Sequence, residues 1–211
     1  MPKITDIETQ KKNKNRVNVY LDGEFAFGLE MLTVLKLGLK IGQDISPQEL
    51  KEAIFDSEKA VALEKGMSYI DRGRKTAKQV RDYIEGKGYD PQVVNYVVEK
   101  LKYYGYVDDS LYASDYAKQN FSSKGARRIK QELIQKGISL AQAEKYSAQD
   151  SDDALKYATQ LAQRYMKNKQ SDLKTLQKLQ RHLVSRGYDF DVVNSVIRTF
   201  RDGPTDNESD D

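Results

Sequence analysis

Lys87-Gly88-Tyr89-Asp90 occurs three times in this chain in recognisable form. Arg186-Gly187-Tyr188-Asp189 is a near copy, and Lys136-Gly137-Ile138-Ser139 is a looser one. The three glycines are separated by 49 and then 50 residues. An internal period of this length is typical of proteins built from stacked repeats, each repeat being one supersecondary unit. We therefore expect tandem repeats with thin cores rather than one large core.

The apolar pattern repeats in register with the glycines. Before each glycine, three apolar residues recur at i, i+3 and i+7, which is one face of a helix. These triplets are Ala77/Val80/Ile84, Ala126/Ile129/Leu133 and Leu176/Leu179/Leu183. After Gly88, Asp90-Pro91 is a strong start signal for a further, valine-rich helix. Each glycine is therefore predicted to take the left-handed conformation at the C-terminus of the second helix of its repeat.

The predicted fold is mainly α. Three tandem three-helix repeats form an elongated row, preceded by a small N-terminal three-stranded β-meander with short helices. The meander and its helices take residues 1–56, and the repeats take residues 57–109, 110–150 and 151–201. Residues 202–211 are predicted to be a disordered acidic tail, because they lack a sizeable apolar residue.

The meander is predicted from three short segments near the N-terminus. Residues 3–10 alternate weakly, and Arg16–Leu21 is rich in β-branched residues. Asp22-Gly23 favours a two-residue type I′ hairpin turn, and residues 24–29 return as the third strand. Three strands of this size need helix cover for stability.

Helix cover is expected from two short helices. Leu32, Leu35 and Leu39 are predicted to face the sheet from the first of them. The second begins at Ser46-Pro47-Gln48-Glu49 and runs to about Phe55. The first helix of the repeats is expected as a separate element over residues 58–70.

The composition excludes several classes of protein. There is no cysteine, so disulfides, thiolate metal sites and cysteine nucleophiles are absent. The N-terminus lacks the apolar run of a signal peptide, and the chain lacks the roughly 18 apolar residues of a membrane span. We expect a soluble, cytoplasmic, monomeric protein with no membrane association.

Catalysis finds little support in the sequence. His182 is the only histidine, and its equivalents in the other repeats are Tyr83 and Glu132, so this position is not reserved for imidazole. The pairs Asp108-Asp109 and Asp152-Asp153 suit acid–base or metal chemistry, but they lie where helices begin, and capping explains them better. Nucleotide and zinc motifs such as the P-loop and H-E-x-x-H are missing. We predict no enzyme activity, no catalytic residue, no cofactor and no metal site.

The charge distribution points to an anionic partner. The net charge is +3, and the tail from Asp202 onward holds five acids without a lysine or arginine, so the body carries +8. Basic residues gather on the loop and second helix of two repeats: Arg72, Arg74, Lys75, Lys78 and Arg81 in the first, and Lys124, Arg127, Arg128 and Lys130 in the second. Equivalent pairs, Lys78 with Arg127 and Lys75 with Lys124, are predicted on the side away from the core triplets. Such a row suits phosphate backbones or an acidic protein groove, and a merely solvated helix face is the alternative.

A further set of aromatic residues has two possible roles. Tyr103, Tyr104 and Tyr106 lie at the end of the first repeat. They can pack between repeats, which we favour, or stack on nucleic-acid bases.

These motifs together resemble a known family. Arg72-Gly73-Arg74-Lys75-Thr76, the stretch from Gly105-Tyr106-Val107-Asp108-Asp109 to Ala113, and Lys124-Gly125-Ala126-Arg127-Arg128-Ile129 are similar to segments of the RecX family, bacterial regulators of the RecA recombinase. The resemblance covers about residues 1–201 and leaves out the acidic tail.

The resemblance implies a regulatory activity that depends on binding and not on a catalysed reaction. Family members bind RecA, insert along the groove of its filament on single-stranded DNA, and restrain or disassemble it. That limits ATP hydrolysis, strand exchange, recombination and the SOS response. The expected partners are thus the RecA filament and single-stranded DNA, with double-stranded DNA as a further candidate. The alternative is a sequence-tolerant DNA-binding protein built from helix-turn-helix-like three-helix modules.

Overall fold

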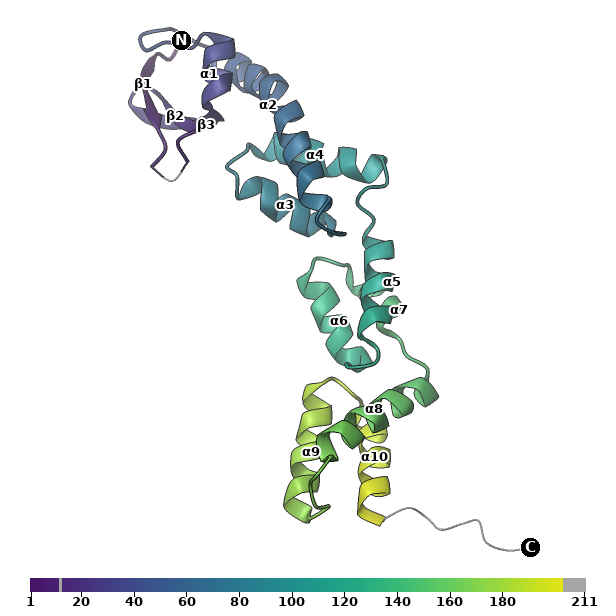
Figure 1. Cartoon of the computed structure of the whole chain (residues 1–211). Coiled ribbons are helices and arrows are strands. Elements are labelled where there is room, and N and C mark those ends of the chain that lie inside the picture. Colours follow the sequence, from purple (N-terminus) through teal and green to yellow (C-terminus); the bar gives the residue numbers. More distant parts are fainter. Residues whose placement is uncertain (12, 203–211) are drawn as a thin grey trace, which may run out of the picture. The chain divides into compact units, whose positions relative to one another are not determined.

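The computed structural model describes residues 1–11 and 13–202, in which a three-stranded sheet is followed by ten helices (Figure 1). The chain divides into two compact units, Met1–Asp108 and Asp109–Asp211. The first contains the sheet and four helices, and the second contains six helices. The predicted class, mainly α with an N-terminal β-meander and three-helix repeats, is confirmed. Within the described residues, every helix is too short or too polar to span a bilayer.

The sheet has the predicted meander topology. Strands β1 (Ile4–Thr9), β2 (Arg16–Leu21) and β3 (Glu24–Glu30) are antiparallel and adjacent in chain order. Asp22 and Gly23 join β2 to β3 with φ values of 47° and 86°, both left-handed as a type I′ turn requires. Buried side chains on one face of the sheet contact the helices that follow: Ile4, Val17, Val19 and Leu29 from the strands, with Val34, Leu39, Leu50 and Ile54.

The first helix presents a different face from the predicted one. In α1 (Met31–Leu37), Leu32 and Leu35 are 54% and 70% exposed, whereas Thr33 and Val34 are buried. The helix begins directly where β3 ends, so the strand sets its rotation before its own apolar pattern can. The prediction for Leu32 and Leu35 was therefore wrong; Leu39 is buried, but it lies beyond the end of α1.

The second helix runs without the predicted break. Ser46 caps α2 (Pro47–Ile70) as expected, but the helix continues through Asp56-Ser57 for 24 residues. Residues 48–65 contain neither glycine nor proline, and the polar side chains at the predicted break are used: Ser57 donates a hydrogen bond to Thr33, and Glu58 is buried. The boundary placed at residue 57 thus falls inside one helix, which serves both the sheet and the first repeat.

The first repeat packs the C-terminal half of α2 against α3 (Ala77–Glu85) and α4 (Pro91–Tyr103). A capping box at Thr76 and Gln79 begins α3, and Asp90 caps α4 as predicted. The buried core is Ala62, Val80, Ile84, Tyr89, Val93, Val94, Val97, Val98, Leu101 and Val107.

The second unit holds the other two repeats. Its helices are α5 (Asp109–Asn120), α6 (Ala126–Gln135), α7 (Leu140–Ser147), α8 (Ser151–Met166), α9 (Leu173–Ser185) and α10 (Phe190–Asp202). The second repeat buries Ala113, Ala117, Ile129, Leu133, Ile138 and Ala143. The third buries Ala158, Ala162, Met166, Leu176, Leu179, Leu183, Tyr188, Val193 and Val196. Asp202, the first residue of the predicted tail, still belongs to α10, and residues 203–211 lie outside the described part of the chain.

The glycine joints have the predicted backbone conformation. Gly88, Gly137 and Gly187 have φ values of 85°, 90° and 89°. The joint at Gly187 also contacts the second repeat: the N–H of Gly125 donates to the carbonyl oxygen of Arg186, next to Gly187, at 3.0 Å. A Cβ on Gly125 would lie 2.3 Å from the carbonyl oxygen of Gly187. The second and third repeats therefore meet through backbone that tolerates no side chain at position 125.

Candidate partner-binding surface

In the first repeat the predicted basic residues lie around the start of α3. Arg72 and Arg74 are exposed on the preceding loop, and Lys78 is exposed on the helix, where it pairs with Asp82 four residues on. Arg81 is half-buried and donates to Asn95 Oδ1 at 2.6 Å. Val80 and Ile84 are fully buried on the opposite side, which agrees with the helical pattern.

In the second repeat the basic residues are more heavily used within the protein. Arg127 is exposed and donates to the carbonyl oxygen of Val184 at 3.1 Å, in the third repeat. Arg128 pairs with Glu132 at 2.8 Å, and Lys130 pairs with Glu144 at 2.9 Å. Arg127, which was predicted to face away from the core triplet, and Arg128 are both exposed on α6.

Lys124 occupies a different environment from the predicted one. Its side chain is only 21% exposed, and its ammonium lies 2.6 Å from Glu132 Oε2 and 3.2 Å from the Tyr116 hydroxyl. Burial would raise the pKa of Glu132, but hydrogen bonds from Lys124, Tyr116 and Arg128 outweigh it and lower this pKa to about 2. Lys124 therefore belongs to an internal network that joins α5 to α6.

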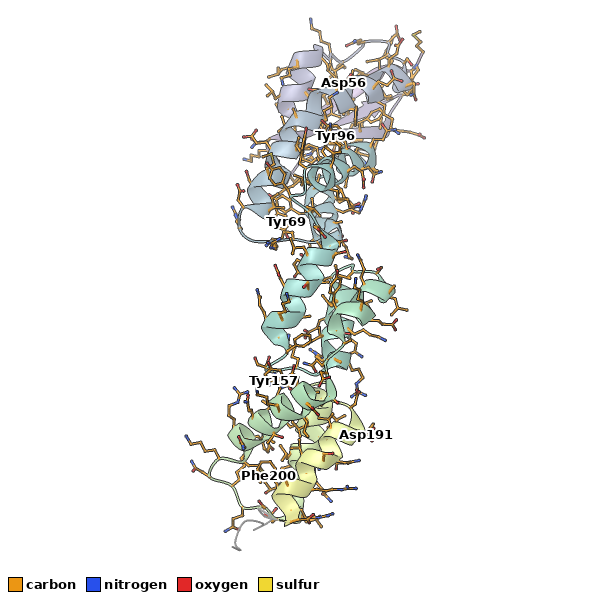
Figure 2. The ribbon with its side chains drawn as sticks, turned by 90° about the vertical axis from the view of Figure 1, so that its right-hand side faces the viewer. Asp56, Tyr69, Tyr96, Tyr157, Asp191 and Phe200 are labelled. Atoms are coloured by element: carbon orange, nitrogen blue, oxygen red, sulfur yellow. The ribbon has the colours of Figure 1, made fainter. Side chains whose placement is uncertain are left out.

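A cluster of rings and cations recurs in the repeats, and the sequence analysis missed it. In the first repeat, Tyr69 (Figure 2) stacks on Tyr83 with ring centres 4.1 Å apart. The ammonium of Lys75 lies 5.3 Å from the centre of the Tyr69 ring, and that of Lys87 lies 5.1 Å from the Tyr83 ring. The cluster joins the last turn of α2 to α3; Lys87 is exposed and Lys75 is half-buried.

The later repeats build related clusters with different partners. In the second, Tyr116 donates to Glu132 at 2.6 Å, and the ammonium groups of Lys124 and Lys136 lie 5.4 and 5.2 Å from its ring centre. In the third, Tyr165 stacks on His182 at 4.9 Å, with Lys169 over the Tyr165 ring at 3.4 Å.

The glycine register makes the equivalence clear. Tyr83, Glu132 and His182 are equivalent, and Lys87, Lys136 and Arg186 are equivalent one turn later. Burial, with the nearby charges of Arg186 and Lys169, lowers the pKa of His182, so the folded state disfavours the imidazolium form. The available signal was a tyrosine near the end of each first helix, within a few residues of a lysine.

The carboxylate pairs lie at helix starts. Asp109 is in the first turn of α5, while Asp152 and Asp153 are in the first turn of α8 behind the cap residue Asp150. Such positions favour negative charge through the helix dipole. Across residues 1–11 and 13–202, groups of three or more histidine, aspartate or glutamate side chains suited to a metal ion are not found.

A buried ionic cluster fixes the sheet to the first repeat. Arg16 is 1% exposed; its guanidinium lies 3.3 Å from Glu30 and donates to the carbonyl oxygens of Gly28 at 2.6 Å and Gly88 at 2.5 Å. Glu58 is also buried, 3.9 Å from the same guanidinium.

Lys65 and Tyr89 complete this cluster. Lys65 donates to Glu30 and to the Tyr89 hydroxyl, each at 2.7 Å, and Tyr89 donates to Glu30 at 2.9 Å. Burial raises the pKa of Glu58, whereas the hydrogen bonds from Lys65 and Tyr89 outweigh burial and lower the pKa of Glu30. Tyr89, predicted to lock helix to helix, thus joins α2, the sheet and the glycine joint.

Four family models match consecutive parts of this chain. The regulatory protein RecX N-terminal domain matches residues 2–46, and the first, second and third three-helix domains of RecX match residues 62–101, 108–145 and 151–197. The chain belongs to the RecX family. The gap between the first two matches lies within α2, the continuous helix that links the N-terminal domain to the first three-helix domain.

Relatives and solved structures agree with this assignment. Regulatory protein RecX of Clostridium botulinum (strain Alaska E43 / Type E3) is 35% identical over 203 residues, which cover 94% of this chain and 96% of the relative. That of Clostridium perfringens (strain SM101 / Type A) is 37% identical with the same coverage. A crystal structure of regulatory protein RecX superposes with a TM-score of 0.63 at 24% identity, covering 93% of this chain and 98% of the other, a likeness of fold.

The residues of the buried ionic cluster come from two domains of the RecX family. Arg16, Gly28 and Glu30 come from the RecX N-terminal domain, and Tyr89 comes from the first three-helix domain. The cluster therefore joins two family domains into the single first unit of this RecX-family chain.

Proposed function

We propose that this protein is a non-enzymatic regulator that binds the RecA filament on single-stranded DNA and mostly inhibits its ATPase, strand exchange and SOS activity. The observation that carries the proposal is the set of four RecX domain matches in order along the chain, supported by relatives named regulatory protein RecX that cover 94% of it. The RecA filament and DNA are the partners that this family resemblance implies. The protein acts as a cytoplasmic monomer.

The surface chemistry supports an anionic partner. Arg72 and Arg127 are exposed, and Lys78 pairs with the exposed carboxylate of Asp82. Exposed ion pairs contribute about 0–1 kcal/mol, so a carboxylate or phosphate of a partner can replace Asp82 at little cost. Lys124 is different, because its network is partly buried and its removal would disturb the fold. Arg72, Lys78 and Arg127 are therefore the preferred contact residues within the predicted basic face.

Filament binding can be tested with charge variants. The variant Arg72→Glu/Lys78→Gln makes the charge of the basic face more negative by three, because it removes two positive charges and adds one negative charge. A matched control, Lys14→Glu/Lys40→Gln, makes the same change at exposed positions in the N-terminal domain. We expect the first variant to co-sediment less with RecA filaments on single-stranded DNA, and the control to bind as the parent protein does.

Two outcomes would reject parts of this proposal. Equal losses in both variants would mean that net charge, and not this face, governs binding. Binding to naked DNA with no association with RecA filaments would favour the alternative of a sequence-tolerant DNA-binding protein.

A further inference from the structure

Three tyrosines at the end of the first repeat project into solvent. Tyr103, Tyr104 and Tyr106 are 81%, 57% and 56% exposed, while the next residue, Val107, is buried. Tyr103 is the last residue of α4, and the chain then turns at Gly105, whose φ is 72°. Large apolar surfaces gathered in this way on a soluble domain mark contact sites.

The backbone below these rings is fixed. The N–H of Tyr104 donates to the carbonyl oxygen of Lys100, and the N–H groups of Tyr106 and Val107 both donate to that of Leu101, at 2.9 and 3.2 Å. The exposed rings therefore stand on a well-defined helix end rather than on a loose loop. The turn at the end of α4 therefore directs the rings outward.

The rings keep their faces available. The centres of Tyr103 and Tyr104 are 5.3 Å apart with the planes at 73°, and those of Tyr104 and Tyr106 are 6.3 Å apart at 56°. Neither pair is stacked face to face. The Lys100 ammonium lies 5.9 Å from the centre of Tyr103 and 5.8 Å from that of Tyr104, so positive charge accompanies the rings.

We propose that Tyr103, Tyr104 and Tyr106, with Lys100, form a stacking platform for the bases of a single-stranded nucleic acid. Unpaired bases offer π-faces to tyrosine rings, and their phosphates are complementary to the adjacent ammonium. A duplex keeps its base faces stacked inside, so it cannot use such a platform. The inference rests on the proposed function, because it takes single-stranded DNA as a partner. It adds that the bases of the strand are recognised and names the residues that recognise them.

The test compares two labelled strands of equal length and charge, oligothymidylate and its abasic counterpart, without RecA. The full-length protein is expected to bind the strand with bases at least about tenfold more tightly than the abasic strand. Tyr103→Ser/Tyr104→Ser should bind both strands equally, at the abasic level. Tyr103→Phe/Tyr104→Phe keeps the rings and should behave as the parent protein. The dependence of affinity on salt should be the same for all three proteins, because the phosphate contacts are unchanged.

Several results would overturn the inference. Unchanged binding of oligothymidylate by the serine variant would do so, as would a loss that is equal on both strands. A variant that binds both strands normally but no longer inhibits RecA would show that the platform contacts protein. Circular dichroism checks the fold, and the single change at the more exposed Tyr103 replaces the double variant if that variant loses helicity.

The two proposals fail separately. If the parent protein inhibits RecA but does not distinguish the two strands, the platform is wrong and the regulatory function stands. If it distinguishes the strands but leaves RecA unaffected, the platform stands and the regulatory function is wrong.

Discussion

Arg16 donates a hydrogen bond to the carbonyl oxygen of Gly88, which lies 72 residues further along the chain. This contact joins the start of β2 to the glycine joint of the first repeat. The same guanidinium contacts Gly28 and Glu30, so one side chain connects the sheet with α3, α4 and their joint. The N-terminal domain is thus held to the first repeat by a charged centre as well as by apolar contacts.

Replacing Arg16 should destabilise the first unit strongly. Arg16→Met leaves the buried Glu58 without its nearest cation and two carbonyl oxygens without a donor. Removal of one partner from a buried ionic cluster costs about 3–5 kcal/mol. Urea unfolding followed by circular dichroism measures the loss. Arg72→Met, a change on the exposed loop, should lie within about 0.5 kcal/mol of the parent protein. Similar values for the two variants would contradict the role assigned to Arg16.

The joint between the second and third repeats should not accept a side chain at position 125. Gly125→Ala places a Cβ against the backbone of Gly187, and that backbone has to move. We expect faster amide exchange at position 125 and at Tyr188, measured by hydrogen exchange, with the helices otherwise intact. Gly86→Ala is the control, since Gly86 has an ordinary helical φ of −62°. Unchanged protection in Gly125→Ala would show that the repeats are not joined there.

Acid should weaken the network around Glu132. Its pKa is lowered to about 2 in the folded protein from an ordinary value of 4.5, so the folded state releases this proton more readily. The resulting stability, at most ~3 kcal/mol at 1.36 kcal/mol per pKa unit, is present above pH 4.5 and is lost as the pH falls toward 2. Exchange protection of α6 should therefore fall over this range. Glu132→Gln should be less protected at pH 7 and change less with acid; an identical acid response would exclude Glu132 as its source.

His182 offers a direct measurement of the third cluster. Burial, together with Arg186 and Lys169, lowers the pKa of this ring, so the folded state disfavours the imidazolium. Because the unfolded state binds this proton more tightly, the folded protein loses stability as the pH falls below about 6.5, the ordinary pKa of histidine. As the only histidine, it gives a single imidazole signal in a proton NMR titration, and we expect a midpoint below that of a histidine peptide. A midpoint at or above the peptide value would contradict the packing against Tyr165. His182→Tyr, which copies Tyr83, should keep the stack and lose the pH dependence.

The repeats could be predicted because their determinants are local. A glycine with a positive φ, an aspartate cap and a triplet at i, i+3 and i+7 act within one or two turns of helix, and Gly88, Asp90 and Val80 all behave as their neighbours in sequence require. The same holds for the Asp22-Gly23 turn.

The parts that could not be predicted depend on distant residues. In the sequence Arg16 is an ordinary strand residue, and its contacts with Gly88 and Glu58 form only in the folded chain. Lys124 sits on the outer side of a helical wheel, but Tyr116 and Glu132 from two helices cover it. The helix predicted to end at about Phe55 continues through Ser57, whose hydrogen-bond partner, Thr33, belongs to another helix.

The most direct test of the account is the steady-state ATPase of RecA filaments on single-stranded DNA, measured while this protein is titrated in. A parallel titration of the same DNA without RecA gives the affinity for DNA alone. We expect ATP hydrolysis to fall with increasing protein at concentrations well below those that saturate the naked DNA. A constant ATPase rate up to concentrations at which the DNA itself is bound would contradict the proposed regulation of RecA.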